Sequence, residues 1–162
     1  EALAPALGLS PGDIGFGTHR PAVWQGGPAF LYVPVTSVEA LGRARPIQPH
    51  WDAVMRAAGV DSAYLYTPGA DCAFRARMFS PTAGIPEDPA TGSASAILAA
   101  QLQAAGALRG TEDRFHLRQG VEMGRPSDIH LTVQRNGARL ERVLIRGSAV
   151  AVSNGRISVP HG

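Results

Sequence analysis

Two adjacent carboxylates precede a short run of hydroxyl and glycine residues, a pattern suited to binding a small acid and moving its protons. Glu87 and Asp88 are followed by Thr91, Gly92 and Ser93. If a helix begins here, its first N–H groups lack partners inside the helix and its dipole places partial positive charge there. Gly92 allows close approach to the backbone and Ser93 adds a hydroxyl. Residues 91–93 are therefore a candidate binding site for a carboxylate or phosphate, with Asp88 and Glu87 beside it as candidate acids or bases.

The same residues also have a purely structural interpretation. Acidic groups near a helix N-terminus complement the helix dipole, and Asp88, Thr91 or Ser93 can each cap the helix. With Asp88 as the cap, Pro89 would take the first helical position, where proline is common. The residue types alone favour neither interpretation.

Arg77 lies on the strand that we expect just before this acidic pair. An arginine at that place can form an ion pair with Glu87 or Asp88, or it can contact an anionic substrate. We favour the ion pair, which makes Arg77 and Glu87 supporting residues of the candidate site.

Other kinds of chemistry find little support in the residue types. The chain contains no lysine, so Schiff-base formation, pyridoxal phosphate attachment and a phosphate-loop lysine are excluded within it. Cys72 is the single cysteine and lies in an apolar run, which favours a core position over a nucleophile. The five histidines show no spacing typical of metal ligands, so we expect no metal site.

Composition indicates one globular domain. The chain has 162 residues, 44% hydrophobic and 17% charged, and no apolar run approaches the length of a membrane span. The net charge is only +2 and the arginines alternate with acidic residues, so neither a nucleic-acid partner nor a membrane partner is expected. A lone cysteine suits a reducing cytoplasm.

A nearly uncharged segment, residues 89–108, is the element that would position the candidate site. A helix that is apolar on almost all sides is buried on almost all sides, and Gly106 marks its end. Trp51, Val54, Met55 and Ala58 repeat with the period of a helix that buries one side, before Gly59. Short strands, mostly in hairpins, are expected at residues 22–24, 30–35, 63–66, 72–79, 115–117, 129–134, 140–145, 149–152 and 157–159. Pro34 suggests that its strand lies at an edge or bulge. We predict an α+β fold in which a curved, mostly antiparallel sheet wraps around a buried central helix.

Several motifs resemble those of the phenazine biosynthesis PhzF-like isomerase family. They are Arg-Met-Phe-Ser-Pro at 77–81, Gly-Ile-Pro-Glu-Asp-Pro-Ala-Thr-Gly-Ser-Ala at 84–94, Gln-Gly at 119–120 and Met-Gly-Arg-Pro-Ser at 123–127. The resemblance implies a diaminopimelate epimerase-like fold, in which two related lobes each wrap a sheet around a central helix and the active site lies between them. Residues 1–162 resemble a single lobe, the second or C-terminal one.

The resemblance also implies an activity. Members of this family isomerise small carboxylic acids by proton transfer without metal or cofactor, and they commonly form homodimers. By that likeness Asp88 is catalytic, and Gly92 and Ser93, beside Thr91, bind the substrate carboxylate. The proton-transferring glutamate belongs to the first lobe and has no counterpart here, so we expect little turnover from this half alone. A non-catalytic, carboxylate-binding module that self-associates through the cleft face is the alternative.

Overall fold

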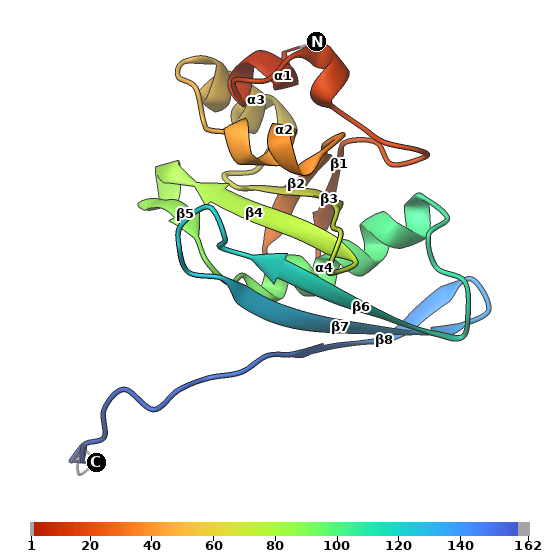
Figure 1. Cartoon of the computed structure of the whole chain (residues 1–162), viewed down its shortest axis with the longest axis vertical. Helices are drawn as coiled ribbons and strands as arrows, with labels where there is room; N and C mark the ends of the chain where they lie inside the picture. Colours follow the sequence, from red (N-terminus) through yellow and green to blue (C-terminus); the bar gives the residue numbers. More distant parts are fainter. Residues whose placement is uncertain (1, 159–162) are drawn as a thin grey trace.

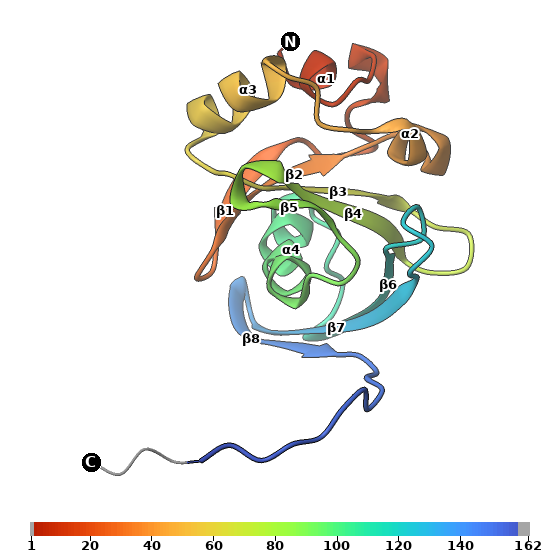
Figure 2. The same cartoon turned by 90° about the vertical axis from the view of Figure 1, so that its left-hand side faces the viewer.

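One curved sheet surrounds the longest helix of the chain (Figures 1 and 2). The computed structural model describes residues 2–158. Within that range the eight strands are β1 (Ala22–Gln25), β2 (Ala29–Pro34), β3 (Ala63–Pro68), β4 (Phe74–Ser80), β5 (Ile85–Asp88), β6 (Glu112–Gln119), β7 (Ser127–Asn136) and β8 (Arg139–Arg146). Their order is β1-β2-β3-β4-β6-β7-β8, and β5 pairs with β4. The pairs β2/β3 and β4/β6 are parallel and the others antiparallel, which confirms the predicted α+β fold with a mostly antiparallel sheet.

The central helix is α4 (Gly92–Ala104), and the inner face of the sheet curls around it (Figure 2). Leu98 and Leu102 are fully buried, and they belong to the same core cluster as the inward-facing Tyr32, Tyr64 and Leu131. Gly106, with a φ of 67°, takes the left-handed conformation just beyond the helix, as predicted. The sheet does not close, so one side of α4 stays partly open between β1 and β8 (Figure 2).

Three short helices cover the outer face of β2, β3 and β4 (Figure 1). These are α1 (Leu3–Ala6), α2 (Val38–Arg43) and α3 (His50–Ala58); the 3₁₀ turns are Pro11–Asp13 and Pro81–Ala83. Trp51 and Met55 of α3 face inward, as the helical period predicts, and pack with Val33 and Leu65 of the sheet. The strands β2 and β3 are thus buried on both faces, which explains why their sequences are apolar without alternation.

The two strands expected at residues 149–152 and 157–159 are wrong within the described range. Residues 147–158 have no strand and run away from the body of the molecule (Figure 1), and residue 159 lies outside the description. Val150, Val152 and Ile157 are almost fully exposed. A strand needs a neighbour to pair with its backbone, and none of the described strands pairs with this segment.

Two further details differ from expectation. The strand β5 was not predicted, because Glu87 and Asp88 have low strand propensity; its pairing with β4, which sets Asp88 opposite Met78, holds it extended. Pro34 does not mark an edge, since β2 lies between β1 and β3. It lies beyond Tyr32, the last residue of β2 that pairs with β1, so the N–H that proline lacks is not needed there.

Among residues 2–158, no helix has the length and hydrophobicity to cross a bilayer.

Candidate functional site

The acidic residue Asp88 ends β5, and α4 begins four residues later at Gly92. Thr91 is the N-cap residue by its extended backbone, but its side chain makes no capping bond. Instead, the Thr91 hydroxyl donates a hydrogen bond of 2.6 Å to Oδ2 of Asp88. Of the caps that the sequence allowed, Thr91 is therefore the one in the structure, and its hydroxyl hydrogen-bonds to the Asp88 carboxylate and not to the helix backbone.

The first turn of α4 presents two free backbone donors to the outside. Gly92 and Ser93 are exposed, and their N–H groups have no partner among residues 2–158. Outside its own helix and chain neighbours, the nearest atom to a Cβ on Gly92 would be Ile145 Cγ2 at 3.9 Å, so no other element crowds the backbone here. Exposed, unpaired N–H groups at the positive end of a helix dipole are a suitable place for a carboxylate.

Buried hydroxyl groups hold this turn from the inside of the sheet. The Tyr32 hydroxyl donates to the carbonyl of Ala94 at 2.7 Å, and the Tyr64 hydroxyl lies 3.2 Å from the Ser95 hydroxyl. The Ser95 hydroxyl donates in turn to the carbonyl of Thr91 at 2.9 Å. Burial raises the pKa of both tyrosines above the ordinary value, so each remains a neutral phenol that can donate. These bonds fix where the helix begins.

The structure places Arg77 and Glu87 together in a largely buried ion pair. The Arg77 guanidinium contacts both Glu87 carboxylate oxygens at 2.8 Å, and its third nitrogen donates to the carbonyls of Leu41, Gly42 and Ala44. All three nitrogens are thus engaged within the fold. Arg77 and Glu87 connect α2 to the strands β4 and β5, and they leave Asp88 as the acidic residue at the start of α4.

One residue at this place was not predicted as part of the site. Gln119, fully buried at the end of β6, hydrogen-bonds to both Asp88 and Thr91. Its sequence signal was weak but present. Phe115, Leu117 and Gln119 alternate along β6, so a polar amide occupies an inward-facing position where an apolar residue is usual.

The remaining candidate groups lie outside this arrangement. Cys72 lies in the turn between β3 and β4, where partial burial raises the pKa of its thiol and Asp71 raises it further. His19 hydrogen-bonds to the Tyr66 hydroxyl at 2.7 Å. In the part of the chain that the structure describes, no group of three or more His, Cys, Asp or Glu residues could hold a metal. The chemistry available at the start of α4 is that of a carboxylate beside backbone and hydroxyl donors.

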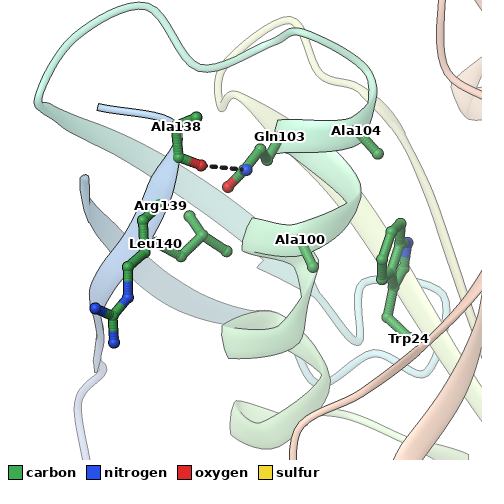
Figure 3. Close-up of a pocket in the computed structure, with 7 residues that line it drawn as sticks. All are labelled: Trp24, Ala100, Gln103, Ala104, Ala138, Arg139 and Leu140. Atoms are coloured by element: carbon green, nitrogen blue, oxygen red, sulfur yellow. Dashed lines mark hydrogen bonds between the residues drawn. The ribbon is translucent and has the colours of Figure 1, made fainter. Parts of the chain in front are cut away.

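A hollow of about 490 Å³ lies at the opposite end of α4 (Figure 3). It is lined by Trp24, Ala100, Gln103, Ala104, Ala138, Arg139 and Leu140. The Trp24 indole nitrogen already donates to Gln101, and the Gln103 amide donates to the carbonyl of Ala138. The residues that line this hollow all lie in the described range, and none of them carries a carboxylate or a thiol. It therefore offers no acid–base group comparable to Asp88.

Comparison with known proteins places the chain in one family. A family model described as phenazine biosynthesis-like protein matches residues 2–155. An uncharacterized isomerase of Mesorhizobium japonicum is 36% identical over 165 residues, which cover 98% of this chain and 55% of the relative. The trans-2,3-dihydro-3-hydroxyanthranilate isomerase of Pseudomonas aeruginosa is 34% identical over 154 residues, covering 95% of this chain and 51% of that enzyme. The chain thus spans about half the length of the curated relatives that it matches.

Solved structures show the same fold. A predicted epimerase from Pseudomonas aeruginosa superposes with a TM-score of 0.65 at 34% identity, over 91% of this chain and 49% of that one. A PhzF-family phenazine biosynthesis protein from Bacillus anthracis gives a TM-score of 0.78 at 22% identity, over 90% and 50% of the two chains. The second likeness supports the fold alone. Together they confirm the predicted diaminopimelate epimerase-like architecture.

Proposed function

The chain belongs to the phenazine biosynthesis-like protein family, and we propose that it forms part of a cofactor-independent isomerase that moves a proton within a small carboxylic acid. The isomerase names of its relatives support the reaction class. The observation that carries the proposal is the Asp88 carboxylate, held by the Thr91 hydroxyl at 2.6 Å beside the open N–H groups of Gly92 and Ser93.

In the proposed reaction a C–H bond at one carbon of the substrate breaks and a C–H bond forms at another, so no atom is gained or lost. The substrate carboxylate binds at the start of α4, to the N–H groups of Gly92 and Ser93 and the Ser93 hydroxyl, with Thr91 shaping the turn. Asp88 handles a proton at the reacting end, because its Oδ1 has no partner among residues 2–158 while Oδ2 is held by Thr91. Glu87 and Arg77 support this strand through their ion pair.

We further propose that a first lobe completes the site, either in the same chain or in a separate one. Two observations support it. The chain matches about half of each relative, and it exposes several large apolar side chains. These are Val23, Ile85, Leu144, Ile145, Val150, Val152 and Ile157. Burial against the first lobe would remove them from water and exclude water from the site. Homodimer formation and a cytoplasmic location remain predictions.

Deuterium exchange tests the proposal. Trans-2,3-dihydro-3-hydroxyanthranilate, the compound named for the relatives, is incubated in heavy water with the two-lobe protein, and its carbon-bound protons are followed by NMR. We expect exchange or isomerisation that Asp88→Asn reduces by about a hundredfold or more, since a positioned acid or base contributes about 10²–10⁴-fold. Ser93→Ala should mainly weaken binding of the compound.

The alternative, a self-associating carboxylate-binding module, gives a different result in the same experiment. It predicts binding that weakens on Ser93→Ala but no exchange, with or without the first lobe. Binding without exchange of the compound would therefore contradict the isomerase proposal, and exchange that survives Asp88→Asn would contradict the role of Asp88.

A further inference from the structure

The amide of Gln119 joins three elements at the point where the proposed site is built. Its Oε1 accepts from the Thr91 N–H at 3.2 Å, and its Nε2 donates to the Asp88 carbonyl at 2.7 Å and to Thr91 Oγ1 at 3.0 Å. The side chain is fully buried. We propose that Gln119 is a positioning residue that directs the Thr91 hydroxyl toward Asp88 and thereby fixes the Asp88 carboxylate. The proposal rests on the isomerase function inferred above.

The partners determine which way round the Gln119 amide lies. The Thr91 N–H can only donate, so it faces the amide oxygen, and the Asp88 carbonyl can only accept, so it faces the amide nitrogen. Rotating the amide by half a turn would set nitrogen against a donor and oxygen against an acceptor. The mismatch at Thr91 would be buried and the one at Asp88 partly buried, where an unmet hydrogen-bonding group destabilises the fold.

This orientation decides the direction of the next hydrogen bond. Because Nε2 of Gln119 can only donate, Thr91 Oγ1 must accept from it. The single hydroxyl hydrogen of Thr91 is then left for Asp88 Oδ2, 2.6 Å away. Two hydrogen bonds in one direction, from Gln119 to Thr91 and from Thr91 to Asp88, hold one carboxylate oxygen, and the other has no partner among residues 2–158.

The backbone next to Gln119 keeps this arrangement rigid. Gly120 has a φ of 77°, and a Cβ there would lie 2.4 Å from the Arg125 carbonyl oxygen and 2.8 Å from that of Pro89. The end of β6 is therefore packed directly against the backbone between Asp88 and Thr91. Such close contact is possible only for glycine, and it prevents Gln119 from shifting relative to the two residues that it binds.

A buried glutamine can also act only as a support for the fold, and the chain supplies a matched control. Gln101, which lies on α4 and is 2% exposed, likewise accepts from one N–H group and donates to one carbonyl and one hydroxyl. It accepts from the Trp24 indole at 2.6 Å and donates to the Arg20 carbonyl and the Tyr66 hydroxyl at 2.8 and 3.0 Å. It lies about 13 Å along the helix from Gly92, at about 1.5 Å per residue. Gln101→Met and Gln119→Met should therefore destabilise the fold similarly.

The first experiment needs no substrate. In the two-lobe protein, three-bond NMR couplings to the Asp88 carboxyl carbon report the χ1 rotamer of the Asp88 side chain. We expect a single rotamer in the parent protein and in Gln101→Met, and rotamer averaging in Gln119→Met and in Thr91→Val. An Asp88 side chain that remains in one rotamer in Gln119→Met would overturn the proposal, whatever the protein catalyses.

The second experiment measures turnover of trans-2,3-dihydro-3-hydroxyanthranilate by the same variants. We expect Gln119→Met to lower kcat about ten- to a hundredfold with a smaller change in KM, as for a misplaced catalytic group. Gln101→Met should leave kcat within about twofold. The double variant Thr91→Val/Gln119→Met should be no slower than the slower single variant, because both changes break one chain of bonds. Equal losses in Gln101→Met, or multiplied losses in the double variant, would also overturn the proposal. A parent protein without turnover would count against the isomerase function, and the rotamer result would still decide the role of Gln119.

Discussion

Replacing Glu87 with glutamine is predicted to destabilise the fold strongly, although the two side chains have almost the same shape. The Glu87 carboxylate receives two hydrogen bonds from the Arg77 guanidinium, each 2.8 Å long. The two side chains are only 16% and 9% exposed. Glutamine keeps one acceptor oxygen but replaces the other with a donor that faces the guanidinium, and it removes the negative charge.

The expected size of the loss follows from the surroundings of Arg77. Breaking a buried ion pair by removing one partner costs about 3–5 kcal/mol, because the remaining charge stays buried. Arg77 retains the carbonyls of Leu41, Gly42 and Ala44, which places the loss at the low end, about 3 kcal/mol. For a chain of 162 residues that corresponds to a fall in Tm of roughly 6–12 °C, at roughly 2–4 °C per kcal/mol.

The assay is urea unfolding followed by circular dichroism, with Glu112→Gln as the control. Glu112 also pairs with an arginine, Arg114, but that pair lies at the surface, with side chains 36% and 77% exposed. Its replacement should leave the unfolding midpoint unchanged within error, because solvent screens such pairs. Equal midpoints for Glu87→Gln and the parent protein would refute the reasoning, since the Arg77 charge would then not depend on Glu87.

Three further predictions concern the core, a tight backbone contact and pH. Leu98→Ala should cost about 2–5 kcal/mol in urea unfolding, because Leu98 is fully buried in the inner core. Gly120→Ala should lower the free energy of unfolding far more than Gly137→Ala. Both glycines have positive φ. A Cβ at Gly120 would lie 2.4 Å from the Arg125 carbonyl oxygen, whereas one at Gly137 would meet nothing within 4 Å. Strain alone gives Gly137→Ala a loss of about 1–2 kcal/mol, and a similar loss at Gly120 would contradict the close packing. Burial lowers the pKa of His19 below its usual 6.5, so the unfolded chain takes up the proton first and stability falls as the pH drops below about 6.5. His19→Gln should remove this part of the decline, which has a slope of at most about 1.4 kcal/mol per pH unit for one proton; an unchanged pH dependence would exclude His19 as its source.

Much of the fold was predictable because its signals are local. The uncharged run before Gly106 predicts a buried helix, and α4 lies there. The helical period of Trp51 and Met55 predicts α3 and its buried side. In each case the residue pattern of a short segment shows which of its sides are apolar, and those sides are the ones that become buried. The exposed segment 147–158 shows the limit of this reasoning: Val150 and Val152 alternate like a strand, but pairing needs a neighbour that a local pattern cannot supply.

For the candidate site, too, the sequence determined one part and the tertiary structure decided another. The sequence by itself determined that Asp88, Thr91, Gly92 and Ser93 gather where a helix begins, because residues so close in the chain cannot lie far apart. Only the tertiary structure decided which partner each polar group takes. It pairs Glu87 with Arg77, turns the Thr91 hydroxyl toward Asp88, and brings in Gln119, which lies 28 residues beyond Thr91. A hydrogen bond depends on distances of a few tenths of an ångström, and those distances are set by the packing of β4, β5 and β6 around α4.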